Sequence, residues 1–309
     1  MIITVTMNPA IDKTVEIEMF EHGGLNRVTN MTVDAGGKGI NVSKTIKALG
    51  GESLATGFLS GNNGKMIQDT LKELGINNQF ISTQGETRVN TKIIEKSGMV
   101  TELNEKGPMV TEYELSKLIS MIDPYLNEKA IVVLSGSISP GLAKDSYKKI
   151  TEYAHGKNAK VFVDADGELF AEAMKAIPDI IKPNKIELEQ YLGMKLEDEN
   201  TILAAGQAIL ACGIKTVIIS LGEKGAYFIS KEHTLYSPGL HVEAHSTVGA
   251  GDAMVAAYVY AMDRGYSEEE RAKLAMATST GAVMTVGTKP PTRTVVEALL
   301  KEVKVTKFV

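Results

Sequence analysis

The stretch Ser246–Met262, STVGAGDAMVAAYVYAM, decides the fold of this chain. Its first half is rich in glycine and small residues, and its second half, Ala253–Met262, is apolar all round. A helix that is apolar on every side is typical of a protein interior. The pattern therefore predicts a buried helix directly behind a glycine-rich turn, with the single carboxylate of Asp252 at the junction.

The start of this helix is a candidate anion-binding site. The first N–H groups of a helix have no partner within it, and the peptide dipoles add to a partial positive charge there. We interpret Gly249, Ala250 and Gly251 as an anion hole for a transferring phosphoryl group, and Asp252 as a general base. The segment alone leaves a second interpretation open, in which Asp252 only satisfies the helix start.

The composition narrows the class of protein. A chain of 309 residues can bury a sizeable core without disulfide bonds or structural metal ions. The net charge of −5 argues against a nucleic-acid-binding protein, which would present a basic face. The single cysteine, Cys212, allows no intramolecular disulfide and no cysteine-based zinc site. No apolar run is long enough to span a membrane and no leader is visible, so we expect a cytoplasmic protein without membrane or nucleic-acid partners.

Outward from the decisive stretch, strand and helix patterns alternate along the chain. Short apolar runs predict strands at 2–6, 53–59, 130–134, 160–163, 180–181 and 216–220, and a hairpin at 226–236. Helical spacing predicts helices at 40–49, 65–74, 112–126, 146–155, 168–176, 202–211, 253–262 and 272–283. Apolar strands each followed by a helix predict an α/β fold with a mostly parallel sheet covered on both faces.

Two regions depart from this scheme. Half-polar, alternating segments near 14–33 and 91–103 predict a small separate β-sheet. We expect a single domain over residues 1–309, with lid strands inserted from about 12–34 and 88–104. The exposed face of such a lid predicts a homodimer joined through it.

Small and polar residues follow the predicted strands at their carboxyl ends. They include Asp12, Ser135-Gly136-Ser137, Asn184 and Ser220-Leu221-Gly222. Ligands of open α/β sheets collect at this edge, so a binding site is expected there. Asp164 also ends a strand, but Asp164-Ala165-Asp166-Gly167 is too compact for an EF-hand loop and receives no role.

The chain has two glycine-rich elements, Gly36–Asn41 and Thr247–Asp252, and their order and separation are typical of a known family. They resemble the two signatures of the ribokinase-like (PfkB) family of sugar kinases, and the resemblance covers nearly the whole chain. It extends to Asn8–Asp12, Ser135–Ser137, Lys182–Asn184 and Ser220–Gly222. It implies a three-layer α/β/α core with a β-sheet lid, and it is closest to the phosphosugar branch of the family.

The resemblance implies roles for individual residues. Asp252 matches the catalytic base, with Gly249, Ala250 and Gly251 as its anion hole. The matching sugar-binding residues are Asp12, Gly36, Gly37, Lys38, Asn41 and Ser137, and Arg27 and Arg88 match positions that hold the existing phosphate of the substrate. The nucleotide site matches Lys182, Asn184, Ser220, Gly222, Gly225, Thr247, Gly249 and Gly251. Asn184 and Glu187 match an element that holds Mg²⁺ through water.

Lys38 needs an argument of its own. It directly precedes the helix that starts at Ile40, where the dipole is already positive and a cation is unfavourable. Its place makes sense if an anion occupies the turn, so we predict that Lys38 reaches the γ-phosphoryl position. The alternative is a solvent-facing lysine; likewise Arg27 and Arg88 could be surface charges, and Glu187 a helix-start acid.

The implied function is an ATP- and Mg²⁺-dependent kinase of a phosphorylated ketohexose. The first choice of substrate is D-fructose 1-phosphate, and D-tagatose 6-phosphate or D-fructose 6-phosphate remain alternatives. A regulator of the same fold that has lost catalysis is a second class of function, and the intact turn around Asp252 disfavours it. A nucleoside kinase is a third, which Arg27 and Arg88 disfavour.

Overall fold

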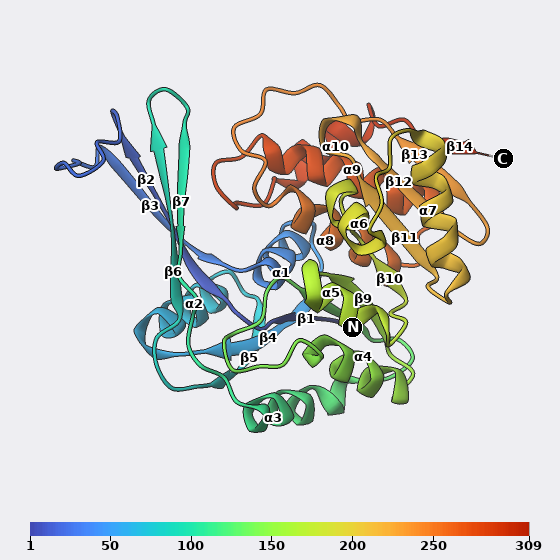
Figure 1. Cartoon of the computed structure of the whole chain (residues 1–309), viewed down its shortest axis with the longest axis horizontal. Coiled ribbons are helices and arrows are strands. Elements are labelled where there is room, and N and C mark those ends of the chain that lie inside the picture. The colour runs from blue at the N-terminus through green and yellow to red at the C-terminus, as the bar shows by residue number, and fades with distance from the viewer. Residues whose placement is uncertain (309) are drawn as a thin grey trace.

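The computed structural model describes residues 1–308. Within this range the strands form a ten-stranded sheet and a separate four-stranded sheet (Figure 1). The large sheet has the order β14-β13-β12-β11-β10-β9-β8-β1-β4-β5. Neighbours from β5 to β11 pair in parallel, and β12, β13 and β14 pair antiparallel at the far edge. The predicted mostly parallel α/β sheet is confirmed.

The elements of the core have the following bounds. The strands of the large sheet are β1 (Ile2–Thr6), β4 (Ser53–Leu59), β5 (Asn77–Ser82), β8 (Ile131–Ser135), β9 (Lys160–Asp164), β10 (Ile180–Ile181), β11 (Thr216–Ser220), β12 (Ala226–Ser230), β13 (Thr234–Ser237) and β14 (Thr306–Phe308). The helices are α1 (Lys38–Ala48), α2 (Gly61–Glu73), α3 (Glu112–Ile122), α4 (Ser146–Gly156), α5 (Gly167–Met174), α6 (Lys185–Leu192), α7 (Glu199–Ala211), α8 (Ala250–Asp263), α9 (Glu268–Val283) and α10 (Arg293–Leu300).

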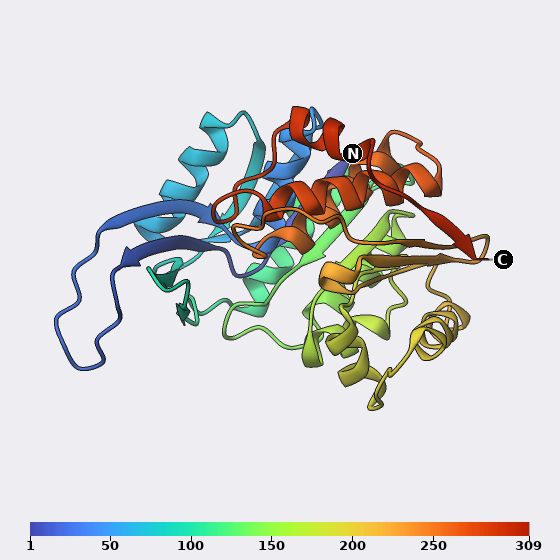
Figure 2. The ribbon, with the colours of Figure 1, turned by 90° about the horizontal axis from the view of Figure 1, so that it is seen from above.

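Helices cover the large sheet on both faces (Figure 2). One apolar core joins the sheet to α3, α4, α5, α6 and α7, and a second joins its other face to α1, α8, α9 and α10. Strands such as β1 and β8 are buried along their whole length, because both of their faces meet helices. Helix α8 is buried along most of its length, as its apolar sequence predicts.

The four-stranded sheet, which we call the lid, has the order β3-β2-β6-β7. Its strands are β2 (Ala10–Ile17), β3 (Asn30–Gly36), β6 (Arg88–Glu95) and β7 (Val100–Asn104), and they project away from the core (Figures 1 and 2). Ile11 and Ala35 anchor the base of the lid in an apolar cluster with α1 and α2. The outer part has only a small cluster of Val15, Ile17 and Ile93, so few apolar contacts hold it to the rest of the molecule.

Several predicted boundaries are wrong. Helix α2 begins at Gly61 rather than residue 65, and α3 ends at Ile122 because Pro124 places 123–125 in a 3₁₀ turn. Residues 27–29 precede β3 instead of belonging to it. Four elements were not predicted at all, namely β5, α6, α10 and β14. β5, α6 and β14 are short or largely exposed, so their apolar periodicity is weak. α10 is the exception, because its apolar residues Val295, Val296, Leu299 and Leu300 recur at helical spacing, a signal that the prediction missed.

No helix within residues 1–308 is long and apolar enough to cross a membrane.

Candidate active site

A polar cleft of about 430 Å³ lies where the lid faces the carboxyl ends of the parallel strands. Lid strands β2, β6 and β7 supply one side of it, and the first turns of α1, α6 and α8 supply the other. The predicted site residues that line it are Asp12, Gly37, Lys38, Asn41, Arg88, Lys182, Asn184, Glu187, Ser220, Gly249, Gly251 and Asp252. The fold therefore gathers residues from both ends of the chain into one cavity.

Asp252 is buried in the first turn of α8, at the inner end of this cleft. Its Oδ2 accepts a hydrogen bond of 2.9 Å from Nδ2 of Asn41. Burial, and next the charge of Asp164, raises the pKa of Asp252 to about 6. Such a carboxylate is ionised at neutral pH yet accepts a proton more readily than an exposed aspartate, as a general base should. Within residues 1–308 no backbone N–H donates to it, so it is not a helix cap.

The turn before Asp252 leaves backbone donors free. Gly249 is the N-cap of α8 with φ of +85°, a left-handed conformation that favours glycine. Among the residues that the structure describes, no carbonyl accepts from the N–H groups of Gly251 and Asp252. Free N–H groups at the start of a buried helix can bind the oxygens of a phosphoryl group.

Asp164 joins two lysines in the wall of the cleft. Its Oδ1 lies 3.1 Å from Nζ of Lys182, and its Oδ2 lies 3.5 Å from Nζ of Lys38. Burial alone would raise the pKa of Asp164, but Lys182 and Lys38 lower it below its ordinary value. The charge of Asp164 in turn raises the pKa of Lys38. This cluster holds two ammonium groups near Asp252, where they can face a phosphoryl group.

The sugar-binding turn predicted at 36–41 packs against Asp12. A Cβ on Gly36 would collide with the Asp12 carboxylate, so glycine here leaves room for that carboxylate in its present position. Oδ1 of Asp12 accepts a hydrogen bond of 3.2 Å from Nδ2 of Asn90 on the neighbouring lid strand. Burial raises the pKa of Asp12 above its ordinary value. The carboxylate thus faces the cleft at the lid, where a sugar hydroxyl could meet it.

Arg88 stands at the start of β6 and lines the cleft. Its Nε and Nη2 donate to the carbonyl of Asn8 at 3.2 and 3.0 Å, and its Nη1 donates to the carbonyl of Glu105 at 3.3 Å. These bonds fix the guanidinium and leave one N–H on each terminal nitrogen. A guanidinium that keeps free N–H groups on both terminal nitrogens can donate to the oxygens of a phosphate.

A second pocket, of about 450 Å³, adjoins the cleft and shares Asn184, Ser220 and Gly251 with it. The predicted nucleotide residues Gly222, Gly225 and Thr247 line this pocket, and so does Ala250 of the predicted anion hole. The rest of its wall includes apolar and small polar side chains that the sequence did not indicate, among them Leu240, Val242, Met254, Met276, Ser279, Thr280 and Val283. They come from a loop and two helices, so no local motif marks them.

Asn184 and Glu187 form a capping box at the start of α6. The Asn184 side chain accepts from the Glu187 N–H at 2.9 Å, and Oε2 of Glu187 accepts from the Asn184 N–H at 2.8 Å. The helix-start interpretation of Glu187 therefore holds, and the same bonds aim it into the cleft. Among residues 1–308, no cluster of three His, Cys, Asp or Glu side chains could hold a metal alone. Mg²⁺ often takes only one or two protein oxygens, with water and phosphate as the other ligands, and this pair fits that use.

Three predicted substrate-binding residues do not line the cleft in this chain, and one of them, Gly36, is buried against Asp12. Arg27 is exposed in the loop between β2 and β3, and Ser137 is exposed after β8. Neither lines the cleft or the adjoining pocket. That Arg27 and Ser137 bind the phosphorylated sugar therefore stays a prediction, which the lining of the cleft in a single chain does not support.

Sequence reasoning also missed residues that do line the cleft. Asn90, Lys92, Glu102 and Asn104 project into it from β6 and β7, and Asp164 lies in its wall. A signal existed for two of them, because Arg88, Asn90 and Lys92 alternate along one strand and must share a face. The partnership of Asp164 with Lys38 and Lys182 left no local signal.

This geometry can be compared with known proteins. A family model described as "pfkB family carbohydrate kinase" matches residues 5–295. The chain belongs to the pfkB family of carbohydrate kinases. The kinase is 34% identical to 1-phosphofructokinase of Bacillus subtilis over 308 residues, which is 100% of both chains. It is 34% identical to 1-phosphofructokinase of Escherichia coli over 280 residues, which is 91% of this chain and 90% of the relative.

The fold comparison agrees with the family. The kinase superposes on phosphofructokinase-2 of Escherichia coli, solved with potassium, with a TM-score of 0.93 and 27% identity over 97% of this chain and 98% of the other. A tetrameric inhibited form of that protein has also been solved. A carbohydrate kinase needs adjoining places for a sugar and a nucleotide, and the cleft and the second pocket provide two cavities that meet beside Asp252.

Proposed function

We propose that this kinase transfers the γ-phosphoryl group of ATP to D-fructose 1-phosphate and produces fructose 1,6-bisphosphate. The observation that carries the proposal is that the two cavities share Gly251, next to Asp252 in the cleft, with Arg88 lining the proposed sugar end. The family, and relatives named 1-phosphofructokinase over nearly the whole chain, support the same substrate class. With its single, exposed Cys212, we expect the enzyme to act in the cytoplasm.

In the proposed reaction, Asp252 removes the proton from a primary hydroxyl of the sugar. The resulting oxygen attacks the γ-phosphorus in line, and the N–H groups of Gly251 and Asp252 stabilise the charge on the transferring oxygens. Lys38 and Lys182 add positive charge on the side of Asp164. Mg²⁺, held by Asn184 and Glu187 through water and by the nucleotide phosphates, would offset further negative charge. Arg88 and Asp12 hold the far end of the sugar.

The alternatives differ by little in shape. In β-fructofuranose the C1 and C6 hydroxymethyl groups flank the ring oxygen almost symmetrically. A sugar bound the other way round would still offer a phosphate to Arg88 and a primary alcohol to Asp252. Tagatose differs in the configuration of one hydroxyl, so the chemistry of the cleft alone does not separate the three substrates.

A kinetic panel tests the proposal. It compares fructose 1-phosphate, fructose 6-phosphate, tagatose 6-phosphate and free fructose with ATP and Mg²⁺. We expect the highest kcat/KM for fructose 1-phosphate and the lowest for free fructose. A higher kcat/KM for either 6-phosphate would mean that this sugar is the substrate, with the same reaction. If the protein turned over none of the sugars, it would instead be a regulator of the same fold that has lost catalysis.

We also propose that two copies of the chain pair through their lids. Strand register places Met31, Val33 and Leu103 on one face of the lid, opposite to the face with Asp12 and Asn90 that lines the cleft. These three apolar side chains are 53%, 44% and 57% exposed. Exposed apolar side chains on one face of a small sheet favour burial against a partner, and the symmetric partner is a second lid. Such a pairing would also give Arg27 a route to the partner's cleft.

A further inference from the structure

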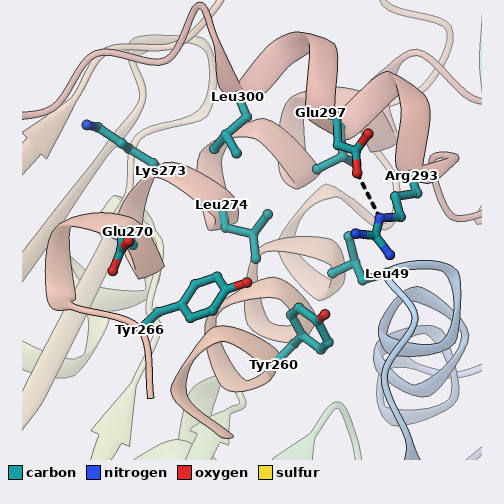
Figure 3. Close-up of a pocket in the computed structure, with 10 residues that line it drawn as sticks. Leu49, Tyr260, Tyr266, Glu270, Lys273, Leu274, Arg293, Glu297 and Leu300 are labelled. Carbon is teal, nitrogen blue, oxygen red and sulfur yellow. Dashed lines mark hydrogen bonds and ion pairs between the residues drawn. The ribbon is translucent and has the colours of Figure 1, made fainter. Parts of the chain in front are cut away.

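A third cavity, which we call the hollow, lies away from the cleft and the nucleotide pocket, among α1, α8, α9 and α10 (Figure 3). Its volume is about 300 Å³, which suits a small molecule rather than a protein segment. Buried Leu49, Leu274 and Val296 form an apolar floor. No residue of the proposed active site takes part in it.

Two tyrosines give this hollow its shape. Tyr260 and Tyr266 lie between its two ends, with Arg293 and Glu297 at one end and Glu270 and Lys273 at the other (Figure 3). A Cβ on Gly51 would fall within 2.7 Å of the Tyr260 ring, so glycine there makes room for the ring. Among residues 1–308 no partner engages either hydroxyl, and both remain available to a ligand.

Arg293 is the cation available to an anionic group. Its Nε donates to Glu297 at 2.8 Å, while no acceptor within residues 1–308 engages its two terminal nitrogens. Figure 3 shows the guanidinium lying beside Leu49 at the edge of the hollow. Lys273 is less available, because its Nζ lies 2.6 Å from Glu269.

We propose that this hollow binds a small carboxylate with an aliphatic or aromatic body and that its occupation alters the kinetics of the kinase. The two free nitrogens of Arg293 match the two oxygens of a carboxylate, and the apolar floor takes the body. A phosphate dianion fits less well, since Glu297 and Glu270 would repel the second charge.

The proposed coupling between the hollow and the active site rests on the helices that line both. Leu49 directly follows α1, which begins with Lys38. Tyr260 lies about 12 Å along α8 from Asp252, at 1.5 Å per residue. Helix α9 continues from Leu274 to Thr280 in the wall of the nucleotide pocket. A ligand that shifts the packing of these helices therefore changes groups at their other ends.

The probes are 3-phenylpropanoate and its neutral amide, 3-phenylpropanamide. Ligand-observed NMR on the full chain should give a dissociation constant on the order of 1 mM for the acid, the range of such small ligands. The amide should bind about tenfold more weakly. Saturating acid should change the KM for ATP or for the sugar phosphate at least about twofold.

Arg293→Gln should abolish both the preference for the acid and the kinetic effect, while leaving the activity without probe unchanged. Lys301→Gln removes the same charge from a residue just beyond α10 that does not line the hollow, and should keep both. Equal binding of acid and amide, or an unchanged preference in Arg293→Gln, would overturn the site. An acid that saturates the hollow and changes neither KM nor kcat would overturn the coupling.

Discussion

Asp252 is a buried carboxylate whose pKa is raised to about 6, and we propose it as the general base of the reaction. Only its ionised form can accept the proton of the sugar. We therefore expect kcat/KM to rise with pH through an apparent pKa of about 6. Asp252→Asn should keep ATP binding and lower kcat by a factor on the order of 10²–10⁴. Steady-state kinetics between pH 5 and 8 measure both, and near-normal turnover of the variant would rule out this base.

The same pKa predicts a stability effect of the opposite sign. Since the folded-state pKa lies above the ordinary 3.8, folding favours the protonated form, and stability falls as pH rises from about 4 to 6. Asp252→Asn removes the buried charge and should stabilise the fold by about 1–3 kcal/mol at pH 8. Urea unfolding measures it. The gain should vanish at pH 4, and a gain that persists there would have another cause.

We propose that Asp164 positions the ammonium groups of Lys38 and Lys182, without contacting the substrates itself. Asp164→Asn leaves Lys38 and Lys182 as two neighbouring cations without a counter-charge, so both should move away from it. We expect kcat to fall at least about tenfold, with a smaller change in the KM of the sugar. Asp166→Asn changes an exposed acid in the same loop and serves as the control. Equal effects of the two variants would mean a general change of charge.

At the scale of elements, strand β6 places several polar side chains in the cleft because alternate residues of a strand point to the same side. Arg88, Asn90 and Lys92 share the face toward the cleft because side chains alternate along β6. Helices α1 and α8 contribute in another way, because each begins at the cleft and lines it with residues of its first turn. Their glycine turns let the backbone approach a ligand closely, which a side chain would prevent.

Arg88→Ala tests the sugar end of the cleft. It should weaken binding of the phosphorylated sugar by about 2–4 kcal/mol, the range for a charged contact removed from water. Any activity on free fructose should change little. Lys96→Ala removes an exposed cation from the end of the same hairpin, and should affect neither substrate. Equal losses on both sugars would show that Arg88 mainly supports the lid through its bonds to Asn8 and Glu105.

At the scale of the whole molecule, the lid is the part with the smallest apolar core of its own. Its outer strands have only the small cluster of Val15, Ile17 and Ile93 as a core, and β3 and β7 are open edges. A partner lid would cover this apolar face and stabilise the strands that carry Asp12 and Arg88.

We therefore expect a dimer at micromolar concentration. Val33→Glu should convert it to a monomer and raise the KM of the sugar phosphate, because buried charge would oppose the pairing. Light scattering and kinetics on one sample measure both. Met66→Glu, on the exposed surface of α2, is the matched control. A monomeric wild-type protein would contradict the proposed pairing.

Much of this protein was determined by short-range patterns in the sequence. The apolar run after Asp252 already indicated a buried helix, since an all-round apolar surface has no stable place in water. The alternation of apolar strands and helices predicted the α/β class, and most core helices were placed to within a few residues. The glycine turns at 36–41 and 247–252 marked the two helix starts that meet at the cleft.

The tertiary structure alone decided what depends on distant residues meeting. Asp164 had no local pattern that pointed to Lys38, which lies on a different element more than a hundred positions away. The exposed position of Arg27 likewise followed from the direction in which the lid projects, not from its neighbours in sequence. Elements β5, α6 and β14 escaped prediction because they are short or largely exposed and carry little apolar periodicity, whereas the helical spacing of α10 was a usable signal that the prediction missed. Local propensity sets where a segment can fold, whereas burial and charge pairing between elements set which side chains meet.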